Sequence, residues 1–249
     1  MKKFTLVLGL IGLFLSASTI SFSQGAQGPK SIGKAGAFIM SSRAGELDCP
    51  ANSIFSQPPT GSNNGYFSDE STLWLDQRIF ENFSGLTSPV GGVTFWGILY
   101  EAGDCHTGAA DNLIVTFYQD NAGSVGTMVQ SFPLTVTPTV TGSLVSGVPL
   151  LRYDLILPST VSLTNGWIMI YRLNPGNSNC ALAWVNTTAG DNLLGYSNFG
   201  GGIINFNDNV AFCLTGQSGP GEVPVSNWAL FIGIGLILAF TVVRFRKIV

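Results

Sequence analysis

The middle of the chain, from residue 48 to residue 216, consists of short apolar runs separated by turn residues. In Tyr153-Asp154-Leu155-Ile156-Leu157, for example, large apolar side chains alternate along the run, and Pro158 ends it. Such a period of two is typical of half-buried β-strands. No stretch of this region keeps the 3.6-residue period of a helix over three turns. We therefore expect an all-β fold, an antiparallel β-sandwich of jelly-roll or Ig-like type with eight to ten strands.

Several details of this pattern refine the expectation. The run from Val93 to Tyr100 has bulky residues at both parities, which predicts a strand that is covered on both faces. The Ser/Thr/Val/Pro-rich segment from Thr135 to Pro149 can supply two edge strands, and the segment from Asn198 to Asn209 is predicted to be a loop. No linker-like change in composition marks a second domain, so residues 48–218 are predicted to form one unit.

The N-terminus has the features of a secretory signal peptide. Two lysines, Lys2 and Lys3, precede an apolar stretch from Phe4 to Leu15, and small residues follow at Ser21 and Ser23. We expect residues 1–23 to form a signal helix that is cleaved after Ser23. Residues 24–47, which are small, polar and rich in glycine, are interpreted as a linker or an irregular first strand.

The C-terminus, residues 219–249, carries a long apolar segment. The nineteen residues from Val225 to Val243 contain no charge, and at about 1.5 Å per residue a helix of this length nearly spans a hydrocarbon core. We predict one transmembrane helix at about residues 226–243. Trp228 would lie at the outer headgroup level, and the basic residues that follow would keep the C-terminus cytoplasmic.

Charge is scarce and uneven in this sequence. Only 10% of the residues are charged, against roughly 25% in ordinary soluble domains. Between residues 24 and 243 there are six Lys and Arg residues but fourteen Asp and Glu residues, a net charge of −8. Binding of nucleic acid needs a basic face, so no nucleic-acid partner is expected.

All four cysteines lie in the part predicted to be exported. An even number of cysteines in an oxidising compartment indicates two disulfides, for which three pairings exist. We favour Cys49–Cys213, between the two ends of the sandwich, and Cys105–Cys180, between two loops. A zinc site is the alternative, but no Cys-x-x-Cys spacing supports it.

The tail as a whole resembles a bacterial sorting signal. It combines the string Val223-Pro224-Val225-Ser226-Asn227-Trp228, an apolar span and the basic end Arg244-Phe245-Arg246-Lys247. This arrangement is similar to the C-terminal tails of exosortase substrates, in the Val-Pro-x-Ser-x-Trp variant found in Bacteroidetes-type surface proteins. The resemblance implies that Val223, Pro224, Ser226, Trp228, Arg244, Arg246 and Lys247 form a motif for an envelope transpeptidase, which would cut near it and pass the ectodomain to the cell surface.

A second resemblance covers the middle of the chain. Four strings carry it: Asp76 with Phe80-Glu81-Asn82-Phe83, then Val93-Thr94-Phe95-Trp96-Gly97, the run from Asp111 to Asn121, and the ending Val210-Ala211-Phe212-Cys213-Leu214-Thr215-Gly216. They are similar to a β-sandwich ectodomain of exported bacterial proteins that carry C-terminal sorting tails. That family has no firmly assigned activity, so the resemblance implies a fold and a location.

Residues that could perform catalysis are few. The only histidine, His106, lies in a loop, and nothing in the spacing of the carboxylates selects a glycosidase pair. We therefore expect no enzymatic activity and no cofactor. Loop aspartates beside asparagines, at Asp111, Asp191 and Asp208, are candidate calcium ligands, although Asp and Asn are also ordinary turn residues.

Aromatic residues offer a candidate binding surface. Trp96 and Trp167 lie in runs that are apolar on both parities, so Trp74 and Trp184 are the better candidates for exposure. Exposed together, these two would form a platform on which sugar rings stack. The sequence thus predicts an exported, non-enzymatic β-sandwich protein that is tethered to or sorted through the envelope and has a structural or adhesive role. The alternative is a carbohydrate-binding module for a surface polysaccharide, and a glycoside hydrolase is the third choice.

The intact mass of the mature protein tests the two terminal assignments together. We expect a chain that starts at Gln24, because the signal peptide is removed, and that ends between Val223 and Asn227, because the tail is cut near its motif. Mass spectrometry of protein taken from the cell surface gives both ends at once. A chain that still ends at Val249 would instead indicate a single-pass membrane protein.

Overall fold

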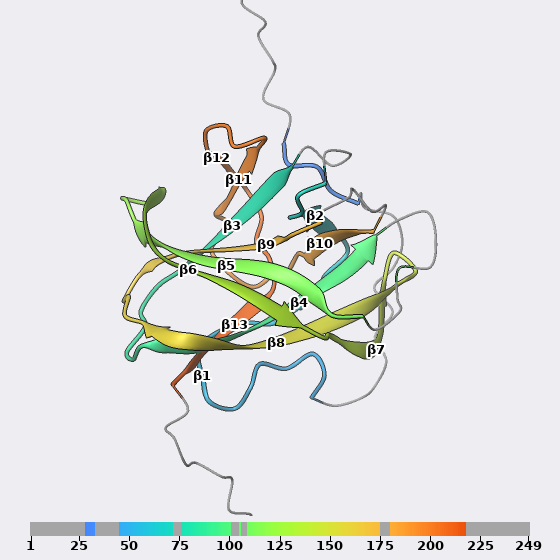
Figure 1. The fold of residues 1–249 in the computed structure, drawn as a ribbon, viewed down its shortest axis with the longest axis horizontal. Coiled ribbons are helices and arrows are strands. Elements are labelled where there is room, and N and C mark those ends of the chain that lie inside the picture. Colours follow the sequence, from blue (N-terminus) through green and yellow to red (C-terminus); the bar gives the residue numbers. More distant parts are fainter. Residues whose placement is uncertain are drawn as a thin grey trace, which may run out of the picture.

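The computed structural model describes residues 28–32, 45–71, 76–100, 105, 109–174 and 180–217. These residues form thirteen β-strands and no helix, and the strands make two antiparallel sheets (Figure 1). The all-β expectation is therefore confirmed for this part of the chain. The two sheets enclose a shared apolar core, an arrangement consistent with a β-sandwich.

The first sheet has seven strands. Its central strand is β4 (Val90–Tyr100), which pairs on one edge with β8 (Val148–Val161), and β8 in turn pairs with β7 (Thr139–Val145). The other edge of β4 is shared by two strands placed end to end. Its first half pairs with β13 (Phe212–Gly216) and its last residues pair with β10 (Ala181–Val185). Outside these lie β1 (Ser53–Gln57), next to β13, and β2 (Gly65–Phe67), next to β10.

The second sheet has six strands. In spatial order they are β12 (Ile204–Phe206), β11 (Leu194–Asn198), β3 (Gln77–Phe83), β9 (Gly166–Arg172), β5 (Asp111–Asp120) and β6 (Val125–Val136). Its two middle strands are β3 and β9, and every neighbouring pair is antiparallel.

Alternating side chains of both sheets meet in the core. From β4 come Val93, Phe95 and Leu99, and strands of the second sheet contribute residues such as Val115 and Ile170. Aromatic rings occupy the centre: Phe95 stacks on Tyr153 at 4.4 Å between ring centroids. Such close packing makes the core sensitive to the loss of a single ring.

The other face of β4, which carries the even-numbered side chains, is buried as well. Trp96 and Ile98 point away from the second sheet and form a separate apolar cluster with residues of β7, β8 and β10. Residues 45–50, which precede β1, pass over this outer face, and their members Leu47 and Cys49 pack against the cluster. The prediction that the run from Val93 to Tyr100 is covered on both faces is thus confirmed.

One segment differs from the sequence-based expectation. The stretch from Asn198 to Asn209 is not entirely loop, because Ile204–Phe206 pairs with β11 as strand β12. Ahead of β2, residues 28–32 run beside that strand, and Ser31 forms an isolated antiparallel bridge with Tyr66. These residues belong to the segment 24–47, which the sequence predicts to be a linker or an irregular first strand.

Truncation of the stacked ring tests the importance of the inter-sheet core. We expect Phe95→Ala to lower the free energy of unfolding by about 3–5 kcal/mol, because the substitution removes buried apolar surface and leaves a cavity. Urea denaturation of the disulfide-intact protein measures this change. The matched control Ile156→Ala, at a side chain that is 87% exposed, should change stability by less than about 0.5 kcal/mol. Equal effects of the two substitutions would contradict the assignment of the core.

Candidate functional site

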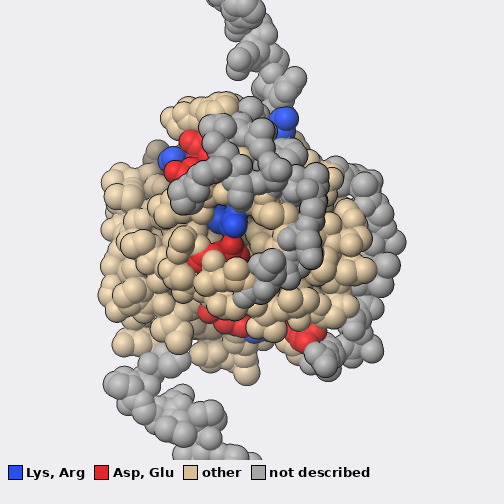
Figure 2. Space-filling view, turned by 45° about the vertical axis from the view of Figure 1, so that its right-hand side comes forward, with Lys and Arg blue, Asp and Glu red and all other residues tan. Residues whose placement is uncertain are grey.

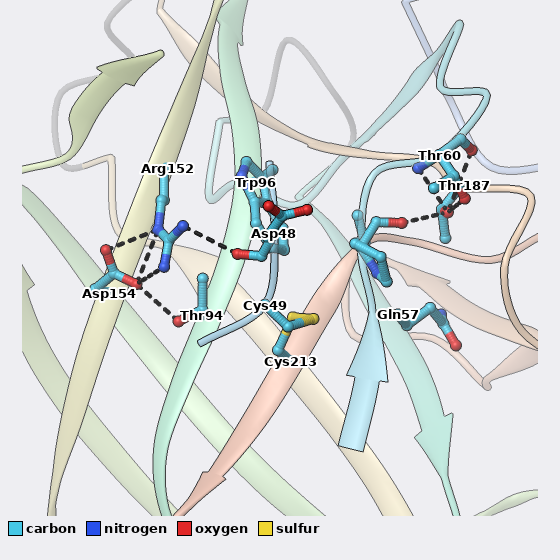
Figure 3. The surroundings of a disulfide bond; sticks show 12 residues. Asp48, Cys49, Gln57, Thr60, Thr94, Trp96, Arg152, Asp154, Thr187 and Cys213 are labelled. Carbon is cyan, nitrogen blue, oxygen red and sulfur yellow. Dashed lines mark hydrogen bonds and ion pairs between the residues drawn. A yellow bond between two sulfur atoms is a disulfide. The ribbon is translucent and has the colours of Figure 1, made fainter. Parts of the chain in front are cut away.

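A disulfide joins the segment before β1 to the last strand. Cys49 lies four residues ahead of β1 and bonds to Cys213 of β13, whose side chain points to the outer face of the first sheet (Figure 3). The two cysteines are separated by 164 residues. In the chain-entropy account, a closure of this length stabilises the fold by about 4–5 kcal/mol, because it restricts the unfolded chain.

Arg152 holds the same segment through its backbone. One guanidinium nitrogen donates to the carbonyl oxygens of Gly45 at 2.9 Å and Asp48 at 3.0 Å, and the group stacks over the ring of Trp96 (Figure 3). Asp154, two residues along β8, orients the guanidinium through hydrogen bonds to Nε and Nη2. We call residues 45–50 the strap, since the disulfide and Arg152 together fasten it across the first sheet.

Trp96 adds a further contact with the strap. Its indole N–H donates to the carbonyl oxygen of Glu46 at 3.0 Å, and the Glu46 carboxylate accepts a hydrogen bond from the backbone N–H of Gly142 at 2.9 Å. The polar edge of a buried ring is thereby satisfied, as it must be in an apolar environment.

The second disulfide, Cys105–Cys180, lies beside a buried ion-pair network. Arg172, at the end of β9, donates to Asp111 at 2.7 Å, to Asp69 at 3.3 Å and to the carbonyl oxygen of Cys180 at 2.6 Å. Asp69 is fully buried and also accepts the backbone N–H of Leu182 in the first sheet. The network therefore ties the two sheets together at one end.

The charges of this network change the ionisation of their neighbours. Burial alone disfavours the charged form of Arg172, but Asp111 and Asp69 outweigh it and raise the pKa of the guanidinium. Burial, followed by the charge of Asp111, raises the pKa of the Tyr153 hydroxyl well above its usual value. Tyr153 donates a hydrogen bond to Asp111 at 2.9 Å, so this hydroxyl group belongs to the same hydrogen-bonded network as Arg172.

Glu81 is a fully buried carboxyl group in the core-facing row of β3, between Ile79 and Phe83. Its two oxygens accept from Gln57 Nε2 at 2.9 Å and from the backbone N–H of Val210 at 3.0 Å. Burial raises the pKa of Glu81 well above its usual value, and the nearby charges of Asp191 and Asp208 act in the same direction. These interactions link β3 to β1 of the first sheet.

The three candidate calcium ligands divide between two places. Asp191 accepts a hydrogen bond from Asn82 at 2.6 Å. Through strand register Asn82 is opposite Trp167, which is opposite Tyr118. Asp111 lies seven residues from Tyr118 along β5, a distance of about 23 Å at 3.3 Å per residue.

The three aspartates therefore do not meet at one place in the fold. Asp111 is bound to Arg172, whereas Asp191 and Asp208 both lie near Glu81. In the described ranges, no group of three or more His, Cys, Asp and Glu side chains is arranged to hold a metal ion.

The predicted aromatic platform loses one of its two members. Trp184 is fully buried in the inter-sheet core, where it lies edge-on to Phe95 and Phe212 and donates to the carbonyl oxygen of Ala211 at 2.8 Å. The expectation that Trp184 is exposed is wrong, because β10 lies between β4 and β2 and the face of β10 that carries Trp184 is turned toward the second sheet. The other member, Trp74, lies outside the described residues.

Two shallow depressions mark the surface near the end of β13. One, of about 260 Å³, is lined by residues 86–89 and 162–164, and the other, of about 220 Å³, by residues 91–92, 155–160 and 215–217. Neither lining includes a His, Cys, Asp, Glu, Lys or Arg side chain. In Figure 2, acidic side chains form small groups, some of them beside basic side chains, on a mostly uncharged surface.

Other predicted features lie outside the described residues. These are the signal peptide, His106 and the sorting motif with its apolar segment. Among the residues that are described, no helix is long and apolar enough to cross a membrane. The two disulfides indicate an oxidising environment, extracellular or periplasmic.

Sequence reasoning missed the charged side chains that link segments of the fold, although three of them leave a signal. Glu81 is the one charged side chain in the row Ile79, Glu81, Phe83, which is otherwise apolar. Arg152 and Asp154 alternate with Leu151, Tyr153 and Leu155, a spacing that predicts an ion pair on one face of a strand. Arg172, in contrast, simply follows an apolar run, and only the fold shows that two carboxylates reach it.

Comparison with known proteins adds no assignment. No protein-family model matches the chain, and neither the curated proteins nor the solved structures include a significant match.

The buried carboxyl group predicts a particular dependence of stability on pH. The pKa of Glu81 is raised in the folded state, so its contribution is fully present below the unfolded-state pKa and is lost as pH rises toward the folded-state value. We expect this one group to lower the free energy of unfolding by about 1.4 kcal/mol per pH unit above roughly pH 4.5.

Urea denaturation across pH measures this slope. Glu81→Gln should remove it, whatever the substitution does to absolute stability, since no proton is then gained or lost at this position. Ile156→Ala, an exposed substitution that changes no titratable group, should leave the slope unchanged. A slope that survives Glu81→Gln would show that another group is responsible.

Proposed function

We propose that the protein is an exported, non-enzymatic component of the bacterial cell envelope, tethered or sorted through its C-terminal tail, with a structural or adhesive role. In this proposal the signal peptide is cleaved, and a helix at about residues 226–243 spans the inner membrane with its C-terminus in the cytoplasm. An envelope transpeptidase then cuts near the sorting motif. The sandwich itself, of jelly-roll or Ig-like type, is the part presented outside.

The attachment of β13 is the observation that carries this proposal. β13 is the last described strand before the tail, so a pull on the tail acts on it first. It is paired on both sides, with β4 and β1, and Cys213 bonds it covalently to the strap. Such a strand cannot be drawn out of the sheet unless the strap is drawn with it, a property that suits a tethered protein.

The described titratable groups support a role without catalysis. Two groups with strongly raised pKa values, Glu81 and Tyr153, are enclosed in the fold and hydrogen-bonded to their neighbours. An acid, base or nucleophile must instead face a site that a substrate can enter. The two depressions supply hydroxyl groups but no general base.

The carbohydrate-binding alternative has less support. A sugar-stacking platform needs aromatic faces that are open to solvent, and Trp184 has none. The hydrolase alternative needs two carboxyl groups that face one cleft, and neither depression is lined by one.

Removal of the protein from the cell tests the proposed role. Deletion of the chain should reduce attachment of the cells to surfaces or to one another, and the full chain should restore it. A version with Cys49→Ser and Cys213→Ser should restore it less well, because β13 is then held by hydrogen bonds alone. The measurements are cell adhesion under flow and the amount of protein on the surface.

Two results would decide against the proposal. One is unchanged adhesion and envelope integrity in the deletion strain. The other is saturable binding of the purified protein on a glycan array, which would favour the carbohydrate-binding alternative.

A further inference from the structure

The two depressions lie at the end of the molecule from which the C-terminal tail leaves. Gln217 lines the depression beside β8, and a Cβ atom added at Gly216 would come within 3.5 Å of Ser88 Oγ, which borders the other depression. In Figure 1 the end of β13 lies at the lower left, whereas β11 and β12 are at the top. We call the lining residues 86–92, 155–164 and 215–217 the tail-side surface.

The tail-side surface carries no charged side chain, although the exported part of the chain is strongly acidic. It offers hydroxyl groups, such as those of Thr87, Ser88 and Ser159, together with apolar side chains. Ile156 is 87% exposed, more than any other large apolar side chain in the described ranges. Contact of this side chain with another surface would remove its apolar area from water.

The length of the tail limits where this surface can lie. Only seven residues, 218–224, separate Gln217 from the uncharged segment that begins at Val225. Even a fully extended chain of seven residues spans no more than about 25 Å. When the segment spans a membrane, the tail-side surface is therefore within this distance of the lipid headgroups.

We propose that the tail-side surface rests on the lipid headgroup layer in the chain before its tail is cut. The orientation follows from charge as well as from length. Bacterial membranes that contain anionic lipids repel an acidic protein, and the uncharged end is the one that can approach without placing like charges together. Hydroxyl groups can then exchange hydrogen bonds with headgroups, while Ile156 leaves the water.

This inference rests on the membrane-spanning tail of the proposed function, and the test separates the two. All four native cysteines are in disulfides, so a thiol introduced at Ile156→Cys can be labelled selectively with an environment-sensitive fluorophore. The matched control is Ile204→Cys on β12, at the far end of the molecule, where the side chain is 47% exposed. The full chain is reconstituted in vesicles of phosphatidylethanolamine and phosphatidylglycerol that contain a lipid with a nitroxide on its headgroup.

We expect the vesicles to carry the protein when they float in a density gradient, and the probe at position 156 to be quenched several-fold more strongly than the probe at position 204. Ser88→Glu should reduce the quenching at position 156, because it places a negative charge against the anionic headgroups. Phe199→Glu, a matched change at the far end, should leave it unchanged.

Each other result has one meaning. Protein that floats with the vesicles but shows equal quenching at the two positions overturns the inference and leaves the spanning tail intact. Protein that does not float overturns the membrane-spanning tail and, with it, the inference. Quenching at position 156 that is insensitive to Ser88→Glu would show that proximity follows from the short connection alone and that the surface makes no contact.

Discussion

Strand β4 has large apolar side chains on both of its faces, and much of the remaining structure keeps both faces out of water. The second sheet covers one face, as in any two-layer β-protein. The other face would be solvent-exposed in a simple sandwich, and here the strap covers it. A strap of six residues has too few contacts to stay in place alone. Its attachment by Cys213, Arg152 and Trp96 is therefore a requirement of the core and not an addition to it.

Basic residues are scarce, and two of the described ones, Arg152 and Arg172, each link parts of the fold. Arg152 binds backbone carbonyl groups on the outside of the first sheet, and Arg172 lies between two carboxylates where the sheets meet. Guanidinium groups suit both tasks, since their several N–H donors point in fixed directions and remain charged when buried. The low charge of the chain is thus compatible with this fold. Through their hydrogen bonds, its few ion pairs connect segments that backbone pairing between strands does not connect.

The pattern of the sequence predicted the repeating parts of the fold well. The alternating run from Tyr153 to Leu157 located β8, and the run from Val93 to Tyr100, which is apolar at both parities, located β4. The pairing of the cysteines also agrees with the favoured one. Short strands such as β2 and β12 have three residues and no measurable period, so nothing local distinguishes them from loops. Their identity depends on partners far away in the chain, and β12 pairs because β11 brings it alongside.

The candidate site was harder to predict for the same reason. The burial of Trp184 follows from the position of β10 inside the sheet, which a single strand does not reveal. The separation of Asp111 from Asp191 follows from strand register, and the two-carboxylate environment of Arg172 from the meeting of segments more than sixty residues apart. Spacing along the chain predicts which residues share a face of one strand. It does not predict which strands are neighbours.

The Cys49–Cys213 bond also has a consequence for proteolysis. It makes a covalent ring of the chain between these residues, and every described strand belongs to this ring or, as with the end of β13, directly adjoins it. A protease that cuts one exposed loop, such as the glycine-rich connection of β11 and β12, opens the ring but releases no fragment. The sandwich and whatever follows Gln217 remain one molecule after the cut. Separation of the sandwich from the tail requires cleavage beyond Cys213. Only a cut in the short stretch after that residue divides the two.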